Sequence, residues 1–158
     1  MDLDATDLTI AALLQQEGRL SATEIARAVG LSVSAANDRL RRLQANGTIR
    51  ATAALLDPAR LGAGCCCFLL LDLAWQGEAE AVAALTARPE VMELHHISGP
   101  HSYLMKIRVA DPAAVQRFLT EAVKPLPAVL RTETIFSLQA EKETPCLPLA
   151  GDLAGGRA

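Results

Sequence analysis

The sequence predicts an α+β protein built of two small domains, and three observations carry this prediction. Residues 1–50 show apolar side chains at helical spacing, with a tight turn between the second and third helical stretches. From residue 64 onward the pattern changes to strand–helix–strand, repeated twice. Residues 51–63 contain proline and glycine, and we expect them to form a linker strand and turn. A chain of 158 residues is long enough for one domain or two small ones.

Each helix expected in residues 1–50 begins at a recognisable capping residue. Asp4, Ser21 and Ser32 precede the helical stretches, and their side chains can accept hydrogen bonds from free backbone N–H groups. Glu24 follows Ser21 at the spacing of a capping box. The apolar stripes expected to be buried are Ile10, Leu13 and Leu14, then Ile25, Ala26 and Val29, then Ala36, Leu40 and Leu43.

The second and third helices meet at residues 29–32, which read Val-Gly-Leu-Ser, and this is typical of a helix-turn-helix. The third helix carries a face that is small and polar at its N-terminal end and cationic further along. Such a face suits a helix in the major groove of DNA, although an ordinary solvated helix can show it too. The residues expected to contact double-stranded DNA are Ser32, Ser34, Asn37, Asp38, Arg41, Arg42 and Arg50.

The net charge of −3 is not typical of a protein that binds nucleic acid, so the distribution of charge matters more. Residues 1–50 contain six arginines and six acidic residues, and four of the arginines lie between positions 39 and 50. The positive field is therefore local, and we expect moderate DNA affinity from one copy and a dependence on oligomerisation for avidity. Asp38 can accept a hydrogen bond from cytosine or pair with Arg41 or Arg42 one turn on.

The second half of the chain predicts a sheet with helices on one side. Residues 48–56 predict a short strand in the linker region, and residues 64–144 then follow the order βαββαβ of a ferredoxin-like antiparallel sheet. Residues 145–158 are rich in proline, glycine and alanine, which predicts a disordered tail. The strands are expected at 65–73, 91–98, 103–109 and 130–138, and the helices at 78–88 and 112–124.

One strand indicates a partner for this sheet. Every residue from Cys65 to Leu71 is apolar, so both faces of that strand are expected to be buried. The helices can cover only one face, and little chain is left to cover the other. We therefore expect a homodimer in which the sheets of two copies meet.

An ordered set of motifs runs through the chain. In the first half these are Leu3-Asp4…Asp7, Gly30-Leu31-Ser32, Arg39-Leu40…Leu43…Gly47…Ile49 and Leu56-Asp57…Leu61-Gly62. In the second half they are Pro89-Glu90-Val91…His95-His96-Ile97-Ser98-Gly99, Leu126-Pro127…Val129-Leu130-Arg131-Thr132-Glu133-Thr134 and Glu141-Lys142-Glu143-Thr144. Together, over residues 2–145, they resemble the Lrp/AsnC (feast/famine) transcriptional regulators.

The resemblance implies a sequence-specific DNA-binding regulator with a winged helix-turn-helix domain and an effector domain. It implies dimers that can gather into octamers, and a small molecule, typically an amino acid, bound between effector domains. No other cofactor is expected. The family's ligand turn falls here on Gly99, Pro100, His101 and Ser102. Many members have aspartate where this chain has Ser102, and serine cannot supply a charge. Thr132 and Thr134 are further candidates, although β-propensity explains them equally well.

A metal- or redox-responsive regulator is an alternative reading. The ligands for it would be Cys65, Cys66, Cys67, His95, His96 and His101. Their spacing does not match a CxxC motif, and free cysteine in an apolar run often behaves as a small buried hydrophobic residue. We therefore expect no metal site, and we expect Cys146 to be the more reactive thiol.

An enzyme is the remaining alternative, because some proteins of similar architecture are tetrapyrrole decarboxylases and fold does not prove function. The second half lacks the aromatic and arginine density of a cleft for a large polyanionic ring. No nucleophile elbow or phosphate loop is present either, so we expect no catalytic activity. No run is long and apolar enough to span a bilayer, and no secretory signal is evident, which predicts a cytoplasmic protein without a membrane partner.

Overall fold

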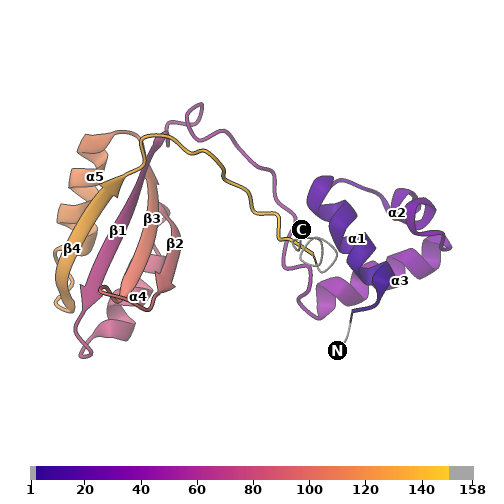
Figure 1. The fold of residues 1–158 in the computed structure, drawn as a ribbon, viewed down its shortest axis with the longest axis horizontal. Helices are drawn as coiled ribbons and strands as arrows, with labels where there is room; N and C mark the ends of the chain where they lie inside the picture. Colours follow the sequence, from indigo (N-terminus) through magenta and orange to yellow (C-terminus); the bar gives the residue numbers. More distant parts are fainter. Residues whose placement is uncertain (1–2, 150–158) are drawn as a thin grey trace, which may run out of the picture. The chain divides into compact units, whose positions relative to one another are not determined.

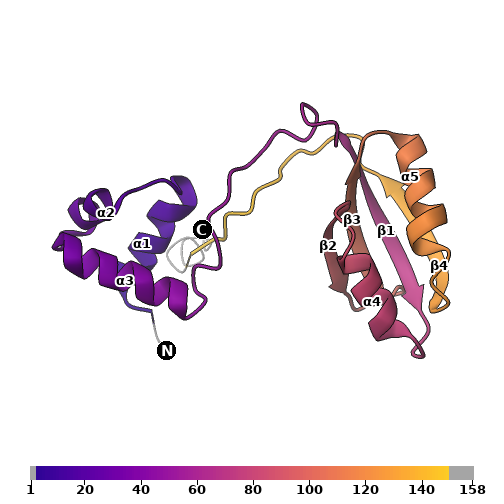
Figure 2. The same ribbon diagram turned by 180° about the vertical axis from the view of Figure 1, so that it is seen from behind.

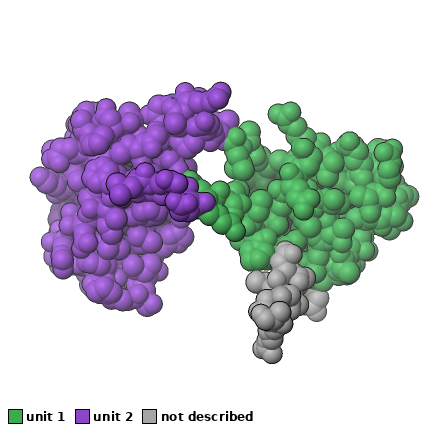
Figure 3. Space-filling model, turned by 45° about the horizontal axis from the view of Figure 1, so that its top comes forward, with its two compact units in different colours: residues 1–55, 142–158 green, residues 56–141 purple. Residues whose placement is uncertain are grey.

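The computed structural model describes residues 3–149, which divide into two compact units (Figure 3). The helical unit comprises residues 3–55 and 142–149, and the sheet unit comprises residues 56–141. Helices alone build the first unit and a sheet with helices builds the second, which confirms the predicted α+β fold class.

The helical unit contains α1 (Ala5–Gln16), α2 (Ala22–Val29) and α3 (Val33–Ala45) (Figure 1). Asp4, Ser21 and Ser32 are the N-caps, as predicted, and each side chain accepts a hydrogen bond from a backbone N–H three residues on. Gly30 ends α2 with φ 68°, a left-handed conformation that glycine adopts without strain. The core is formed by Ile10, Ile25, Ala26, Ala36 and Leu43.

The strand expected over residues 48–56 is not formed. Residues 50–57 are exposed, without helix or strand, and residues 58–62 make a turn. A strand requires backbone hydrogen bonds from a neighbouring strand. Within residues 3–149, the backbone N–H and C=O groups of residues 50–56 form no hydrogen bond with another backbone group. The β-prone sequence there therefore remains an extended connection.

The sheet unit confirms the predicted βαββαβ order. Its elements are β1 (Cys65–Leu73), α4 (Glu78–Thr86), β2 (Val91–His96), β3 (Tyr103–Val109), α5 (Pro112–Phe118), the π-helical segment η1 (Leu119–Val123) and β4 (Val129–Phe136). The strands lie in the order β2-β3-β1-β4, and every neighbouring pair is antiparallel. Both α4 and α5 cover the same face of the sheet (Figures 1 and 2).

The core of the sheet unit lies between that face and the two helices. Alternate residues of β1, namely Cys67, Leu69 and Leu71, are fully buried there, and Leu85 of α4 and Phe118 of α5 pack against them. Burying one leucine side chain contributes about 1.5–3 kcal/mol. β3 contributes four residues to this core, namely Tyr103, Met105, Ile107 and Val109.

The helix after β3 differs from the sequence pattern near its end. The backbone N–H of Lys124 donates to the carbonyl of Leu119 at 2.8 Å, which is the five-residue spacing of a π-helix. Within this widened turn Val123 is buried, and the neighbouring Ala122 is half-buried and packs against the same core.

The face of the sheet opposite the helices is here called the open sheet face. From β1 it carries Cys66, Phe68, Leu70 and Asp72, and all four are half-buried. The sequence predicts that both faces of β1 are buried, but in the single chain only the helix-covered face is. Ile135 of β4 pairs with Phe68 on the open sheet face and is 44% exposed.

Residues 146 and 147 are hydrogen-bonded to α1 within the helical unit. The backbone N–H of Leu147 donates to Gln15 Oε1 at 2.6 Å, and Gln15 Nε2 donates to the carbonyl of Leu147 at 3.1 Å. The Cys146 thiol donates to the Gln15 carbonyl at 3.5 Å. These bonds tie the first part of the predicted disordered tail to α1, and residues 150–158 lie outside the described residues.

Candidate DNA-binding surface and ligand-binding turn

The exposed side of α3 is polar, as a helix that enters the major groove requires. Ser34, Asp38 and Arg41 are exposed, and Asn37 beside them is half-buried. The hydroxyl of Ser32 accepts a backbone N–H of the first turn at 3.2 Å, so it serves as the helix cap. Small polar groups therefore occupy the N-terminal end of this side and a guanidinium lies further along, in the order that the sequence predicts.

Two of the predicted DNA-binding arginines lack a partner among residues 3–149. Arg41 and Arg50 are exposed and form no ion pair there. Asp38 forms none either, so its predicted alternative of pairing with an arginine one turn on does not occur in the structure. The guanidinium groups of Arg41 and Arg50 are accessible to a phosphate.

Arg42 differs from its neighbour, because it is held by a buried carboxylate that the sequence analysis did not connect to it. Its Nη2 lies 2.8 Å from Oδ1 and 2.7 Å from Oδ2 of Asp7 in α1. Arg39 Nη1 binds the same Asp7 at 2.9 Å and the capping residue Asp4 at 2.6 Å. The Asp7 side chain is only 3% exposed. A possible signal was the spacing of Arg39 and Arg42, which places both on one side of α3.

These contacts change the acid–base behaviour of the helical unit. Hydrogen bonding to the guanidinium of Arg39, aided by the backbone N–H of Asp7, holds the pKa of Asp4 below its ordinary value. The hydroxyl and backbone N–H of Ser21 lower the pKa of Glu24 in the same way. Both carboxylates are therefore more acidic in the folded chain than in the unfolded chain.

We expect the helical unit to lose stability as the pH falls through the acid range. A carboxylate with a lowered folded-state pKa contributes its stabilisation above its unfolded value, about 3.9 for aspartate, and loses it as the pH falls through the folded value. Urea unfolding monitored by helical circular dichroism between about pH 5 and 3 measures this loss. Asp4→Asn keeps a good N-cap and removes the charge, so it should reduce the pH dependence. An unchanged dependence in that variant would contradict the assignment.

The turn between β2 and β3 contains the predicted ligand residues Gly99, Pro100, His101 and Ser102. Ser102 closes the turn, because its carbonyl accepts the N–H of Ile97 at 2.9 Å, and it ties the turn to β1, because its N–H donates to the carbonyl of Leu71 at 3.1 Å. The same N–H lies 3.2 Å from Asp72 Oδ1. Gly99 has φ 141°, a conformation that favours glycine.

Two carboxylates that the sequence analysis did not single out lie beside this turn. His101 Nδ1 is 3.2 Å from Asp72 Oδ2, and His101 Nε2 is 3.9 Å from Glu133 Oε2. The His101 side chain is only 9% exposed. Asp72 and Glu133 therefore supply, from β1 and β4, the negative charge that Ser102 does not. The available signal was Asp72 itself, a charge near the end of an apolar strand.

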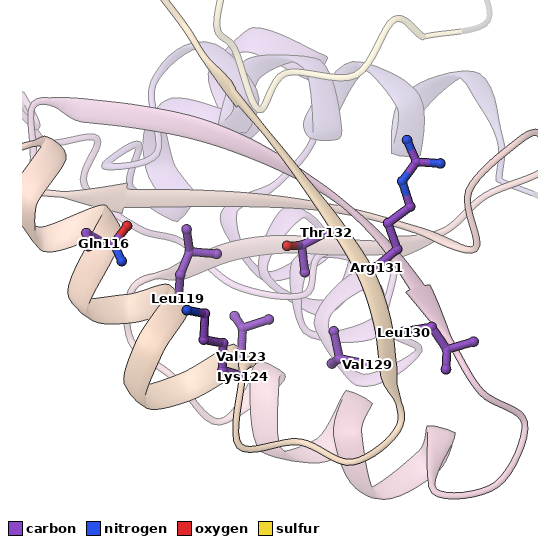
Figure 4. Close-up of a pocket in the computed structure, with 8 residues that line it drawn as sticks. All are labelled: Gln116, Leu119, Val123, Lys124, Val129, Leu130, Arg131 and Thr132. Atoms are coloured by element: carbon purple, nitrogen blue, oxygen red, sulfur yellow. The ribbon is translucent and has the colours of Figure 1, made fainter.

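Thr132 and Thr134 lie on the other face of the sheet. They pair with Leu71 and Leu69, whose side chains point into the helix-covered core, and paired residues of an antiparallel ladder share a face. Thr132 lines a cavity of about 290 Å³ between η1 and β4, which Figure 4 displays. The structure thus brings His101 and Ser102 together with Asp72, and it separates Thr132 and Thr134 from them.

Of the three cysteines in β1, Cys67 is buried, and Cys65 and Cys66 are half-buried. Burial, strengthened by the neighbouring Cys65, raises the pKa of the Cys67 thiol to about 12, so this thiol stays protonated near neutral pH.

Among residues 3–149 no group of three or more His, Cys, Asp or Glu side chains is arranged to hold a metal ion. His95 and His96 point to opposite faces of β2, where they pair with Leu104 and Tyr103.

Known protein families match both units. Residues 66–147 match the Lrp/AsnC ligand binding domain, and residues 3–50 match a winged helix-turn-helix DNA-binding domain. None of the helices within residues 3–149 has the length and apolar character needed to cross a membrane.

Individual relatives span nearly the whole chain. The proline dehydrogenase transcriptional activator of Rhizobium radiobacter is 36% identical over 146 residues, which cover 90% of this chain and 94% of that protein. The leucine-responsive regulatory protein of Salmonella typhimurium is 35% identical over 147 residues, with 90% and 89% covered. A transcriptional regulator of Neisseria meningitidis, solved as a complex with L-Met, has a TM-score of 0.89 and 30% identity, with 95% of this chain and 99% of that chain covered.

Proposed function

Because this chain belongs to the Lrp/AsnC family of transcriptional regulators, we propose that it binds double-stranded DNA through α3 and responds to a small molecule, most simply an amino acid, bound in its sheet unit. The observation that carries the DNA-binding part is the exposed polar side of α3 in a capped helix-turn-helix.

The side chains of α3 can divide the work of DNA recognition. Ser34 and Asn37, near the N-terminal end, can bind base edges, and Asp38 can accept from cytosine. Arg41 suits a guanine edge or a phosphate, and Arg50, just beyond α3, suits a phosphate. Ser32 faces solvent at the helix N-terminus, where its backbone can approach a phosphate.

The effector is proposed to bind at the turn formed by Gly99, Pro100, His101 and Ser102. An amino acid carries an ammonium group, and Asp72 and Glu133 place carboxylates beside this turn. The relative from Neisseria meningitidis was solved with L-Met, which makes an amino acid the first class to test. A cofactor of another kind is not part of this proposal.

The open sheet face is proposed to bind a second copy of the chain. Cys66, Phe68, Leu70 and Ile135 leave an apolar strip half-covered in the single chain, and the same strip on a second copy would bury it. A two-fold dimer would read an inverted repeat with half-sites about one helical turn, or a multiple, apart. Larger assemblies such as octamers would be built from these dimers.

We propose a regulatory and not a catalytic role for the chain. The relatives described above are named as regulators or activators of transcription, and this chain keeps the DNA-binding domain that such a role needs.

A thermal-shift screen against the twenty amino acids is expected to raise the Tm with one amino acid or one chemical class, because a ligand that binds the native state stabilises it. At about 100 times its Kd the ligand would add about 2.7 kcal/mol. The shift should disappear in Asp72→Asn and persist in Thr132→Val, whose side chain lies on the other face of the sheet. A flat screen would contradict an amino-acid effector, and the reverse pattern of variants would move the site to the cavity of Thr132.

A further inference from the structure

We propose that Asp7 is a positioning residue for DNA binding: it engages Arg42 and Arg39 of α3 and leaves Arg41 as the arginine of α3 that contacts DNA. This inference rests on the proposed DNA-binding role of α3. It also gives different roles to Arg41 and Arg42, two adjacent arginines that were both expected to contact DNA.

The contacts of Asp7 occupy its whole carboxylate. Arg42 Nη2 reaches both oxygens, at 2.8 and 2.7 Å, and Arg39 Nη1 reaches Oδ1 at 2.9 Å. Asp4 accepts a further bond from Arg39 at 2.6 Å. Two carboxylates of the α1 N-terminus and two guanidinium groups of α3 thus form a network whose charges cancel, here called the Asp7 network.

Because Asp7 is buried, it is unfavourable for this carboxylate to give up its arginine partners to DNA. The Asp7 side chain is 3% exposed, and a buried carboxylate without a partner is strongly unfavourable. A DNA phosphate that drew the Nη2 group of Arg42 away would leave the buried Asp7 with fewer partners. The Arg42 side chain is 43% exposed, so solvent reaches it, but its Nη2 is already bound.

Arg41 has the opposite environment. It is exposed, and none of residues 3–149 forms an ion pair with it. At 3.6 residues per turn, its side chain leaves α3 about 100° away from that of Arg42. The Asp7 network therefore faces α1, and the free guanidinium is aimed away from it.

A consequence follows for specificity. Phosphate contacts raise affinity for any DNA sequence, whereas base contacts discriminate. By holding two arginines of α3, Asp7 limits the electrostatic attraction to random DNA and keeps α3 tied to α1 in one orientation. Removing the Asp7 charge should release Arg42 and raise affinity for random DNA more than for a selected site.

The first test compares Arg41→Gln with Arg42→Gln in the full chain. Fluorescence anisotropy gives the slope of log K against log salt for a random-sequence 40-base-pair duplex and for a duplex selected from that pool by binding. Each lost phosphate contact makes this negative slope shallower, reducing its magnitude by about 0.9. We expect Arg41→Gln to lower it by about one and Arg42→Gln to leave it unchanged, because Arg42 is held by Asp7 and contacts no phosphate. Equal losses in both variants would overturn the inference.

The second test uses Asp7→Asn, with folding checked by circular dichroism. We expect a slope steeper by about one, since Arg42 becomes free for a phosphate, and a smaller ratio of selected to random affinity. Asp7→Asn combined with Arg42→Gln should restore the wild-type slope. A purely structural role would lower affinity for both duplexes without changing the slope, and that result would overturn the inference. If Asp7→Asn does not fold, the first test decides alone.

Failure of the proposed function gives a different result. A wild-type chain that binds neither duplex at low salt would refute DNA binding by α3 altogether. Wild-type binding with equal effects of Arg41 and Arg42 would refute only the role of Asp7.

Discussion

Phe68→Lys is expected to convert a dimer of this chain into monomers and to weaken DNA binding by roughly 10²–10⁴-fold, the usual gain from joining two binding modules. Phe68 lies in the middle of the open sheet face, between Lys106 of β3 and Ile135 of β4. A lysine there would place an ammonium group beside Lys106 and remove the largest apolar side chain of β1 from the interface.

Light scattering after gel filtration measures the assembly, and anisotropy with an inverted-repeat duplex measures the binding. Leu61→Lys is the matched control, because Leu61 is 64% exposed and belongs to the turn before β1 instead of the sheet. We expect that control to assemble and bind as the wild type does. A Phe68→Lys chain that remains dimeric would show that two copies meet through another surface.

Leu43→Ala is expected to destabilise the helical unit by about 2–5 kcal/mol, a large part of the 5–15 kcal/mol that stabilises a typical domain. Leu43 belongs to α3, is fully buried, and packs with Ile10 of α1 and Ile25 of α2. Its truncation would leave a cavity where the three helices meet, so α3 would lose its fixed position together with part of its apolar burial.

Urea unfolding followed by helical circular dichroism gives the free energy of unfolding. Val33→Ala is the control on the same helix, because Val33 is 48% exposed and alanine favours a helix. We expect that variant to change stability by less than about 0.5 kcal/mol. A loss in Leu43→Ala no larger than in Val33→Ala would mean that α3 is held chiefly by the Asp7 network and not by the apolar core.

The helical unit was largely predictable because its signals are local. A capping residue such as Ser21 and the glutamate three positions on satisfy each other's backbone groups within one turn. Apolar spacing likewise identified Ile25 and Leu43 as core residues. The wrong prediction in this region, the strand at 48–56, concerned an element that cannot form without a partner strand.

The sheet unit was predictable in order but not in detail. The continuous apolar run of β1 and the repeated strand–helix–strand pattern predicted the strands, whereas the helix-covered side of β4 depended on its register with β1. That register separates Thr132 from the turn of Ser102 and brings Glu133 toward His101. Residues from two strands and a turn meet there, and no spacing along the chain encodes their proximity.

The sequence by itself determined the two-part α+β fold, the caps of α1, α2 and α3, and the family. These depend on neighbours within about one turn or one strand, and on motifs read in order. Only the tertiary structure decided that Arg42 is bound by Asp7 while Arg41 has no ion-pair partner within residues 3–149, and that Asp72 and Glu133 lie beside His101 in the turn between β2 and β3. Charges separated by tens of residues interact only after packing has brought them within a few ångströms, so their pairing is a property of the folded chain.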